Sequence, residues 1–232
     1  MFREVDKDFF KRWTPEMAYV LGYFAADGTM FKNRRGGHFI EFHSTDKRLI
    51  EITRAALNSN HHIGIRMPGT GKGGKNHKIG YRLQIGSKEM FADLHNLGFV
   101  QNKSLILTLP EIPSKCIADF VRGYFDGDGC IYFKRLKFAD RKKPRWIVLS
   151  LFTSGSRRFL SNLHDTLKKY GVEGGSLKNK ARGFELMFSS KDSLALYRLM
   201  YNTAPDTGLY LPRKYKLFRK AMRKLYPDAA VV

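Results

Sequence analysis

An internal repeat limits the folds open to this sequence more than any other feature. Residues 20–28 (VLGYFAADG) and 121–129 (VRGYFDGDG) are identical at six of nine positions. Two further pairs of similar segments follow in the same order: 43–49 with 153–159, and 81–89 with 184–192. Three matched pairs in one order indicate a tandem duplication, with an N-terminal half at residues 1–110 and a C-terminal half at residues 111–232.

Each half is predicted to have the element order α-β-β-α-β-β-α. Thr14, Pro15 and Glu16 supply an N-cap, a proline at the first helical position and an acid in the first turn. The expected helices are residues 15–26, 46–58, 88–97, 114–127, 156–169, 191–201 and an extra basic helix at 214–226. The expected hairpins are residues 29–44, 62–86, 130–153 and 175–190. We therefore expect an α+β fold of two pseudo-symmetric αββαββα halves.

The repeated helices each carry small residues on one face. Gly22 and Ala26 lie four positions apart, as do Gly123 and Gly127, so each pair shares a helix face. Two faces without bulky side chains allow two helix backbones to approach closely. We predict that the repeated helices pack against each other.

An acid followed by glycine ends each repeated helix, at Asp27 and Asp128. We expect the glycine to be an ordinary C-cap, but a negative charge at this end is disfavoured by about 0.3–1 kcal/mol. Parallel pairing would also bring two carboxylates together, which requires a compensating cation. A divalent metal held by carboxylates, backbone carbonyls, water and a substrate phosphate meets that requirement.

The chain is strongly basic. Its 232 residues include 42 Lys and Arg against 21 Asp and Glu, a formal net charge of +21. Such a surplus indicates a polyanionic partner. Membrane insertion is not expected, because no apolar stretch is long enough to span a bilayer. The charged N-terminus and the presence of only two cysteines predict an intracellular protein, in a prokaryotic cytoplasm or an organelle.

The paired segments resemble the LAGLIDADG motif, in the single-chain, two-motif form of the LAGLIDADG homing endonucleases. The resemblance covers nearly the whole chain. It implies motif helices at the interface between halves and two saddle-shaped antiparallel sheets that grip the DNA major groove. It also implies a monomer that makes a site-specific, metal-dependent double-strand cut.

The resemblance further implies site residues. Asp27 and Asp128 match the acids that bind catalytic Mg²⁺, and the backbone carbonyls of Ala26 and Gly127 match auxiliary metal ligands. Ca²⁺ is expected to support binding without cleavage.

Lys103 and Lys214 resemble the family's basic residues near each active centre. They follow their motif acids by 76 and 86 residues. Because these spacings differ, an ordinary phosphate contact or a solvated lysine remains an alternative for each.

Basic residues concentrate in the expected strands and hairpin loops, and alternation would place one basic face on each sheet. The candidate DNA contacts are Lys32, Arg34, Arg35, Arg66, Lys72, Lys75, Lys78, Arg82, Lys134, Arg135, Lys137, Arg141, Arg145, Lys178, Lys180 and Arg182. A strand of about ten residues spans ~33 Å, so two halves would cover about twenty base pairs of double-stranded DNA.

Two other functions remain open. An RNA maturase that assists intron splicing would bind RNA independently of the two acids. A non-cleaving DNA-binding regulator on the same fold would be expected to lose Asp27 or Asp128 and to gain another DNA-binding domain.

Overall fold

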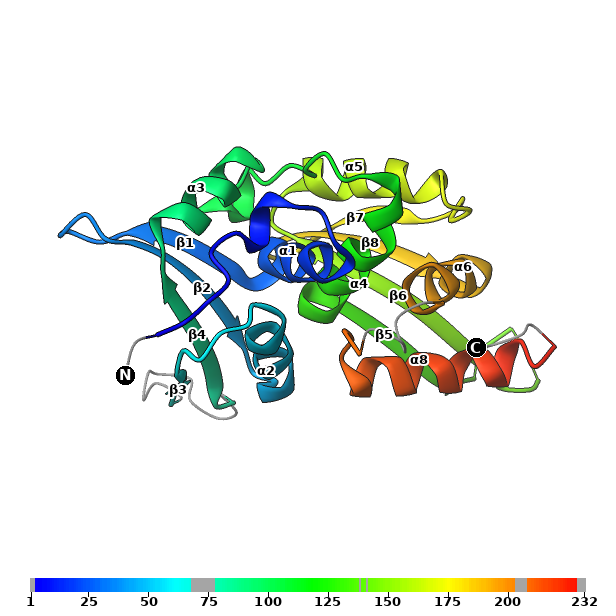
Figure 1. The fold of residues 1–232 in the computed structure, drawn as a ribbon. Coiled ribbons are helices and arrows are strands. Elements are labelled where there is room, and N and C mark those ends of the chain that lie inside the picture. The colour runs from blue at the N-terminus through cyan, green and yellow to red at the C-terminus, as the bar shows by residue number, and fades with distance from the viewer. Residues whose placement is uncertain (1–2, 68–77, 138, 141, 203–207, 229–232) are drawn as a thin grey trace. The chain divides into compact units, whose positions relative to one another are not determined.

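A computed structural model describes residues 3–67, 78–137, 139–140, 142–202 and 208–228 (Figure 1). Each half of the repeat contains a four-stranded antiparallel sheet. The strand orders are β1-β2-β4-β3 and β5-β6-β8-β7, so the second half reproduces the topology of the first. The predicted α+β class with two αββαββα halves is confirmed.

The first half contains α1 (Pro15–Asp27), β1 (Gly28–Lys32), β2 (His38–Ser44), α2 (Lys47–Ala56), β3 (Ile63–Arg66), β4 (Gly80–Gly86) and α3 (Lys88–Asn96). Side-chain caps fix the starts of its helices. Thr14 Oγ1 accepts a hydrogen bond from the Met17 N–H at 3.1 Å, as its sequence position predicts. Asp46 and Ser87 cap α2 and α3 in the same way.

The second half contains α4 (Ile117–Asp128), β5 (Gly129–Leu136), β6 (Arg145–Ser154), α5 (Arg157–Lys168), β7 (Ser176–Lys180), β8 (Gly183–Ser189), α6 (Ser190–Tyr201) and α8 (Pro212–Leu225). The expected helices and hairpins all occur, with bounds shifted by at most three residues. In the described part of the chain, no helix is both long enough and apolar enough to cross a bilayer.

Packing divides the chain differently from the sequence repeat. The first compact unit comprises residues 1–103 and 110–127, and the second comprises residues 104–109 and 128–232. The repeat alone would place the boundary between residues 110 and 111. Residues 117–127 of helix α4 thus pack with the N-terminal half. The last residue of the helix, Asp128, belongs to the second unit.

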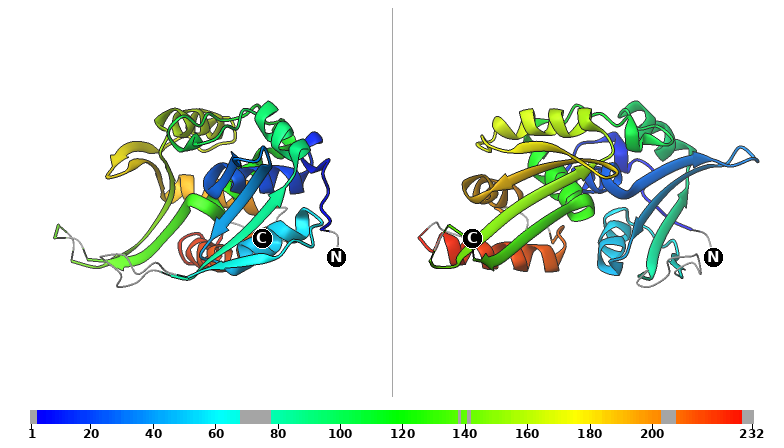
Figure 2. Two further views of the ribbon diagram at one scale, coloured as in Figure 1. Left: turned by 90° about the vertical axis from the view of Figure 1, so that its left-hand side faces the viewer. Right: turned by 180° about the vertical axis from the view of Figure 1, so that it is seen from behind.

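Strand alternation gives each sheet a buried face and an opposite face. In the first sheet, Ile40, Phe42, Leu83 and Ile85 are fully buried beneath helices of the same unit. The buried face of the second sheet is formed by Val148, Phe152, Leu186 and Phe188, against α5 and α6 (Figure 2). We call the opposite faces the open faces.

Candidate active site and nucleic-acid interface

Helices α1 and α4 touch through their glycines, within the first unit. A Cβ atom at Gly22 would lie 2.1 Å from a backbone oxygen of α4, and one at Gly123 would lie 1.9 Å from the Tyr19 oxygen. A Cβ at Gly127 would lie 2.5 Å from Cβ of Ala26. These contacts advance in the same direction along both helices, so the helices are parallel. The predicted helix pairing is confirmed.

A buried polar network joins the same two helices. The Tyr19 hydroxyl donates to Asp126 Oδ2 at 2.8 Å, and Asp126 stands where the first repeat has the buried Ala25. Arg122 donates to Asp119 at 2.5 Å, and its guanidinium lies 5.6 Å from the centre of the Tyr19 ring. Burial raises the pKa of Asp119, against the lowering effect of Arg122. The sequence shows the difference at Asp126, but not its partner across the helix pair.

Each repeated helix ends in its acid. Asp27 is the last residue of α1 and Asp128 the last of α4, and both are half-buried. Within the first unit, a Cβ atom at Gly127 would lie 3.4 Å from Asp27 Oδ2. The two helix ends therefore meet at Asp27 and Gly127, immediately before Asp128 in the chain.

The glycine that follows Asp27 does not have the expected capping conformation. Gly28 has φ −80° and ψ 150°, which is extended backbone rather than the left-handed geometry of a glycine C-cap. The prediction of an ordinary C-cap was therefore wrong here. A Cβ at this position would lie 2.2 Å from Cδ2 of Phe24. A glycine is needed at position 28 because the backbone there lies against the Phe24 ring. Strand β1 begins with this glycine, directly after Asp27.

Lys103 and Lys214 occupy equivalent positions despite their different sequence spacings. Lys103 Nζ donates to the Gly28 carbonyl at 2.6 Å, and Lys214 Nζ donates to the Gly129 carbonyl at 2.6 Å. Both lysines are buried, with 5% and 6% of their surface exposed. Each ammonium group thus contacts the residue that directly follows a motif acid.

A cavity of about 400 Å³ lies beside Asp128 in the second unit. Thr153, Lys180 and Arg182 are among the residues that line it. The Thr153 hydroxyl also donates to the Asp128 carbonyl at 3.0 Å. At the matching position of the first sheet, the residue is His43. The two helix ends therefore have different neighbours on their sheets.

The predicted DNA contacts fall into four groups. On the open faces lie Arg66, Arg82, Lys134, Arg145, Lys178 and Lys180. In the turns or just outside the strands lie Arg34, Arg35, Lys78, Lys137 and Arg182. On the buried faces of their sheets lie Lys32 and Arg135. Outside the described residues lie Lys72, Lys75 and Arg141.

The period of two in a strand explains why Lys32 and Arg135 are separated from the other cations. Lys32 shares a face with Met30, and its Nζ lies 5.7 Å from the centre of the Phe91 ring. Arg135 shares a face with Ile131 and pairs with Trp146. Neither side chain belongs to an open face.

Acids on the open faces engage two of the predicted contact residues. Glu41 contacts the His43 imidazole and forms an ion pair with Arg82 at 3.6 Å. Lys180 Nζ lies 2.8 Å from a carboxylate oxygen of Glu185. Each open face therefore presents both charges, with cations in excess at the turns.

The donor set at the helix ends fits a hard divalent cation that shares its ligands with a substrate. Each end offers one carboxylate together with backbone carbonyl oxygens, and both are oxygen ligands that such a cation takes. Among the described residues, no three His, Cys, Asp or Glu side chains are grouped so that they could hold a metal. Water and substrate oxygens would have to complete the coordination.

Two αββαββα halves, parallel helices in glycine contact and an acid at each helix end define a tandem-duplicated protein class. Residues 14–97 match the family model of the LAGLIDADG-like domain. The N-terminal half is thus similar to the LAGLIDADG-like domain, and the protein is a single chain with two repeats. The resemblance to the LAGLIDADG homing endonucleases is confirmed.

Solved structures share this fold over most of the chain. Meganuclease I-SmaMI bound to uncleavable DNA has a TM-score of 0.59 at 14% identity, with 94% of this chain and 92% of that chain covered. The LAGLIDADG homing endonuclease I-LtrWI bound to target DNA gives 0.58 at 11% identity, covering 97% and 93%. The homing endonuclease I-WcaI bound to its DNA recognition sequence gives 0.58 at 17% identity, covering 90% of each chain. Among curated proteins, no sequence matches.

Proposed function

We propose that this chain is a homing-type DNA endonuclease that makes a metal-dependent double-strand cut in a long, asymmetric target. The observation that carries the proposal is the repetition of one acid–lysine arrangement. Asp27 and Asp128 each end a repeated helix, and a buried lysine contacts the carbonyl of the next residue in both cases. Two equivalent arrangements, one in each repeat, suit an enzyme that cuts two equivalent strands.

Asp27 and Asp128 would bind the divalent cation, Mg²⁺ in the active enzyme, with the carbonyls of Ala26 and Gly127 as further ligands. When bound, such an ion polarises a phosphoryl oxygen and lowers the pKa of bound water. Ca²⁺ would support binding without cleavage. Consistent with this expectation, I-SmaMI is described as bound to an uncleaved DNA target in the presence of calcium ions.

Lys103 and Lys214 would stabilise negative charge that develops beside the acids. Each is removed from solvent and held by a backbone carbonyl. A buried, fixed cation stabilises a developing charge more strongly than a solvated one, because little reorganisation is needed. This reasoning favours a catalytic role over a solvated lysine.

The open faces would contact about twenty base pairs of double-stranded DNA. They differ in chemistry, which supports an asymmetric target. The first face carries the Glu41–His43–Arg82 cluster, whereas β6 places Ile147, Leu149 and Leu151 on the second. Apolar side chains can contact the thymine methyl group, and arginine favours guanine. A monomer would suffice, because one chain carries both faces.

The test is a cleavage selection from a pool of randomised duplexes. Binding is carried out in Ca²⁺, and cleavage is started by exchange into Mg²⁺. The parent is compared with Asp27→Asn/Asp128→Asn and with Asp8→Asn/Asp165→Asn. The latter pair makes the same charge change at two exposed acids, whose ion pairs with Lys11 and Lys168 contribute little to stability.

We expect the parent and the Asp8/Asp165 control to cut one family of sites on both strands. The Asp27/Asp128 variant should bind those sites in Ca²⁺ without cutting in Mg²⁺. Cutting by the Asp27/Asp128 variant would refute the assignment of the acids. Specific binding without cutting by the parent would instead indicate a regulator, and failure to select any duplex would favour RNA as the substrate.

A further inference from the structure

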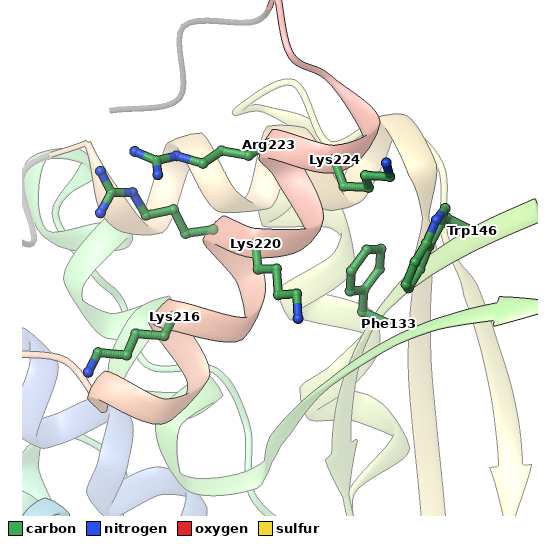
Figure 3. A pocket seen from close by; sticks show the side chains of 7 residues that line it. Phe133, Trp146, Lys216, Lys220, Arg223 and Lys224 are labelled. Atoms are coloured by element: carbon green, nitrogen blue, oxygen red, sulfur yellow. The ribbon is translucent and has the colours of Figure 1, made fainter.

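Helix α8 and the β5–β6 hairpin border a cavity of about 530 Å³ that is open to solvent; it lies in the second unit, apart from the open face of the sheet. Phe133, Trp146 and five cations line it: Lys216, Arg219, Lys220, Arg223 and Lys224 (Figure 3). Phe133 shares a sheet face with Ile131, and Trp146 shares that face with Val148; both neighbours are buried. The cavity is therefore on the buried side of the sheet, where the hairpin extends beyond the core.

The repeat does not explain this cavity. The strands β5 and β6 contain 8 and 10 residues, compared with 5 and 7 in β1 and β2. In the described chain after α3, the first half has only the three-residue 3-10 helix Lys103–Leu105 where the second half has the 14-residue α8. The cavity thus arises from two features that the second half alone possesses.

The aromatic pair provides a flat apolar surface. The Phe133 and Trp146 rings are stacked at 4.6 Å between centroids, with 20° between their planes. Trp146 remains 37% exposed, although Val148, two residues further along the same face, is buried. Such a surface suits a planar ligand, because stacking on an exposed ring buries both faces.

Among the described residues that line the cavity, none is acidic. Lys220 and Lys224 project from α8 on the side of the aromatic pair (Figure 3). They lie four residues apart on the helix, where like charges repel each other. This repulsion between Lys220 and Lys224 lowers the stability of α8. Because the positive charges gather around a cavity in spite of that cost, we expect the ligand to be an anion.

We infer that this cavity binds an unpaired nucleotide of a single-stranded nucleic acid. The base would stack on Trp146, and the flanking phosphates would contact Lys220 and Lys224, the combination that single-strand binding sites use. The volume lies within the range of about 300–1,000 Å³ that is typical of ligand sites. Paired bases are held in their own stack and cannot enter, so duplex bound on the open faces would not compete.

The test measures the affinity of the full chain for labelled twelve-nucleotide oligo-dT and oligo-U by fluorescence anisotropy. We expect Trp146→Ala to weaken binding by about tenfold, from the loss of one base-stacking contact. Trp146→Phe should retain most of the affinity, which separates stacking from any effect on folding. Binding of a fixed duplex should change less than twofold with either variant.

The charge requirement has its own matched control. Lys220→Glu/Lys224→Glu should weaken single-strand binding strongly and reduce its salt dependence. Arg157→Glu/Arg158→Glu makes the same charge change at exposed positions on α5 and should have a much smaller effect. Equal losses from both pairs would overturn the site in favour of general electrostatic attraction.

Intrinsic fluorescence gives a direct readout of stacking. The chain has two tryptophans, so Trp13→Phe leaves Trp146 as the sole tryptophan, whose emission is excited selectively at wavelengths that tyrosine does not absorb. Single strands should quench it, whereas heparin, a polyanion without bases, should bind without quenching. Equal quenching by heparin, or unchanged affinity in Trp146→Ala, would refute the inference. Preference for oligo-dT or oligo-U would identify DNA or RNA as the source of the nucleotide.

Discussion

Gly123→Ala tests whether direct backbone contact holds α1 against α4. The added methyl group would lie 1.9 Å from the Tyr19 carbonyl oxygen and 2.8 Å from its carbon, whereas ordinary contact begins at 3.4 Å. Both atoms belong to the backbone, so no side-chain rotation can relieve the overlap and the helices must separate. Overpacking of this kind costs about 1–3 kcal/mol, here at the upper end. Alanine recovers about 1 kcal/mol through its higher helix propensity.

We therefore expect the free energy of unfolding to fall by about 2 kcal/mol, measured by urea denaturation. For a chain of this size, the melting temperature should fall by about 4–8 °C. Gly64→Ala is the matched control, because its new Cβ would be 3.7 Å from the nearest neighbouring atom. It should change stability by less than about 0.5 kcal/mol. If Gly123→Ala were equally mild, close helix contact would not be what stabilises the pair.

Three further predictions concern buried groups. Lys103→Met or Lys214→Met should slow cleavage about a hundredfold, the effect expected when one preorganised donor is lost. DNA binding in Ca²⁺ should keep its strength. Weaker binding with an unchanged cleavage rate would instead show that the lysine only contacts a phosphate. Cys130 is exposed and Cys116 is buried, and burial is the main cause that raises the pKa of the Cys116 thiol. Cys116 therefore has less of the reactive thiolate form. Mass spectrometry after brief iodoacetamide treatment should find only Cys130 modified. Burial lowers the pKa of His61 below 6.5, so its contribution to stability is present above pH 6.5 and is lost as the pH falls through the folded-state pKa. Between pH 7.5 and 5 the parent should lose more unfolding free energy than His61→Gln, and equal losses would contradict the shift.

The sequence was sufficient for the fold because its signals are local and repeated. Thr14 occupies a cap position that is visible from the residues alone, and its hydrogen bond follows. Gly22 and Gly123 predicted close helix contact because each occurs at the same place in a repeat. Because of the duplication, the helix-contact glycine occurs in both halves. A prediction made from one half can therefore be checked against the other.

Features that depend on a partner far along the chain could not be predicted. Nothing near Asp126 indicates that the Tyr19 hydroxyl, 107 positions earlier, is its donor. The extended conformation of Gly28 depends on the Phe24 ring and on where β1 begins. The sequence groups Lys32 and Arg135 with the other cations, because the face on which a strand residue lies is known only when the register of the strand is known.

The two lysines show why spacing from a motif is a poor guide to an equivalent position. The first hairpin pairs Gly28 with Phe42, whereas the second pairs Gly129 with Phe152, so the second hairpin contains additional residues. These residues lengthen β5 and β6 at their far ends and leave the pairing next to the acid unchanged. Two later segments differ as well: Phe42 to Leu83 spans 41 positions against 34 from Phe152 to Leu186, and Leu83 to Lys103 spans 20 against 28 from Leu186 to Lys214. The sequence distance therefore changes in several segments, while Lys103 and Lys214 still contact equivalent carbonyls. The extended hairpin supplies the wall of the cavity against α8.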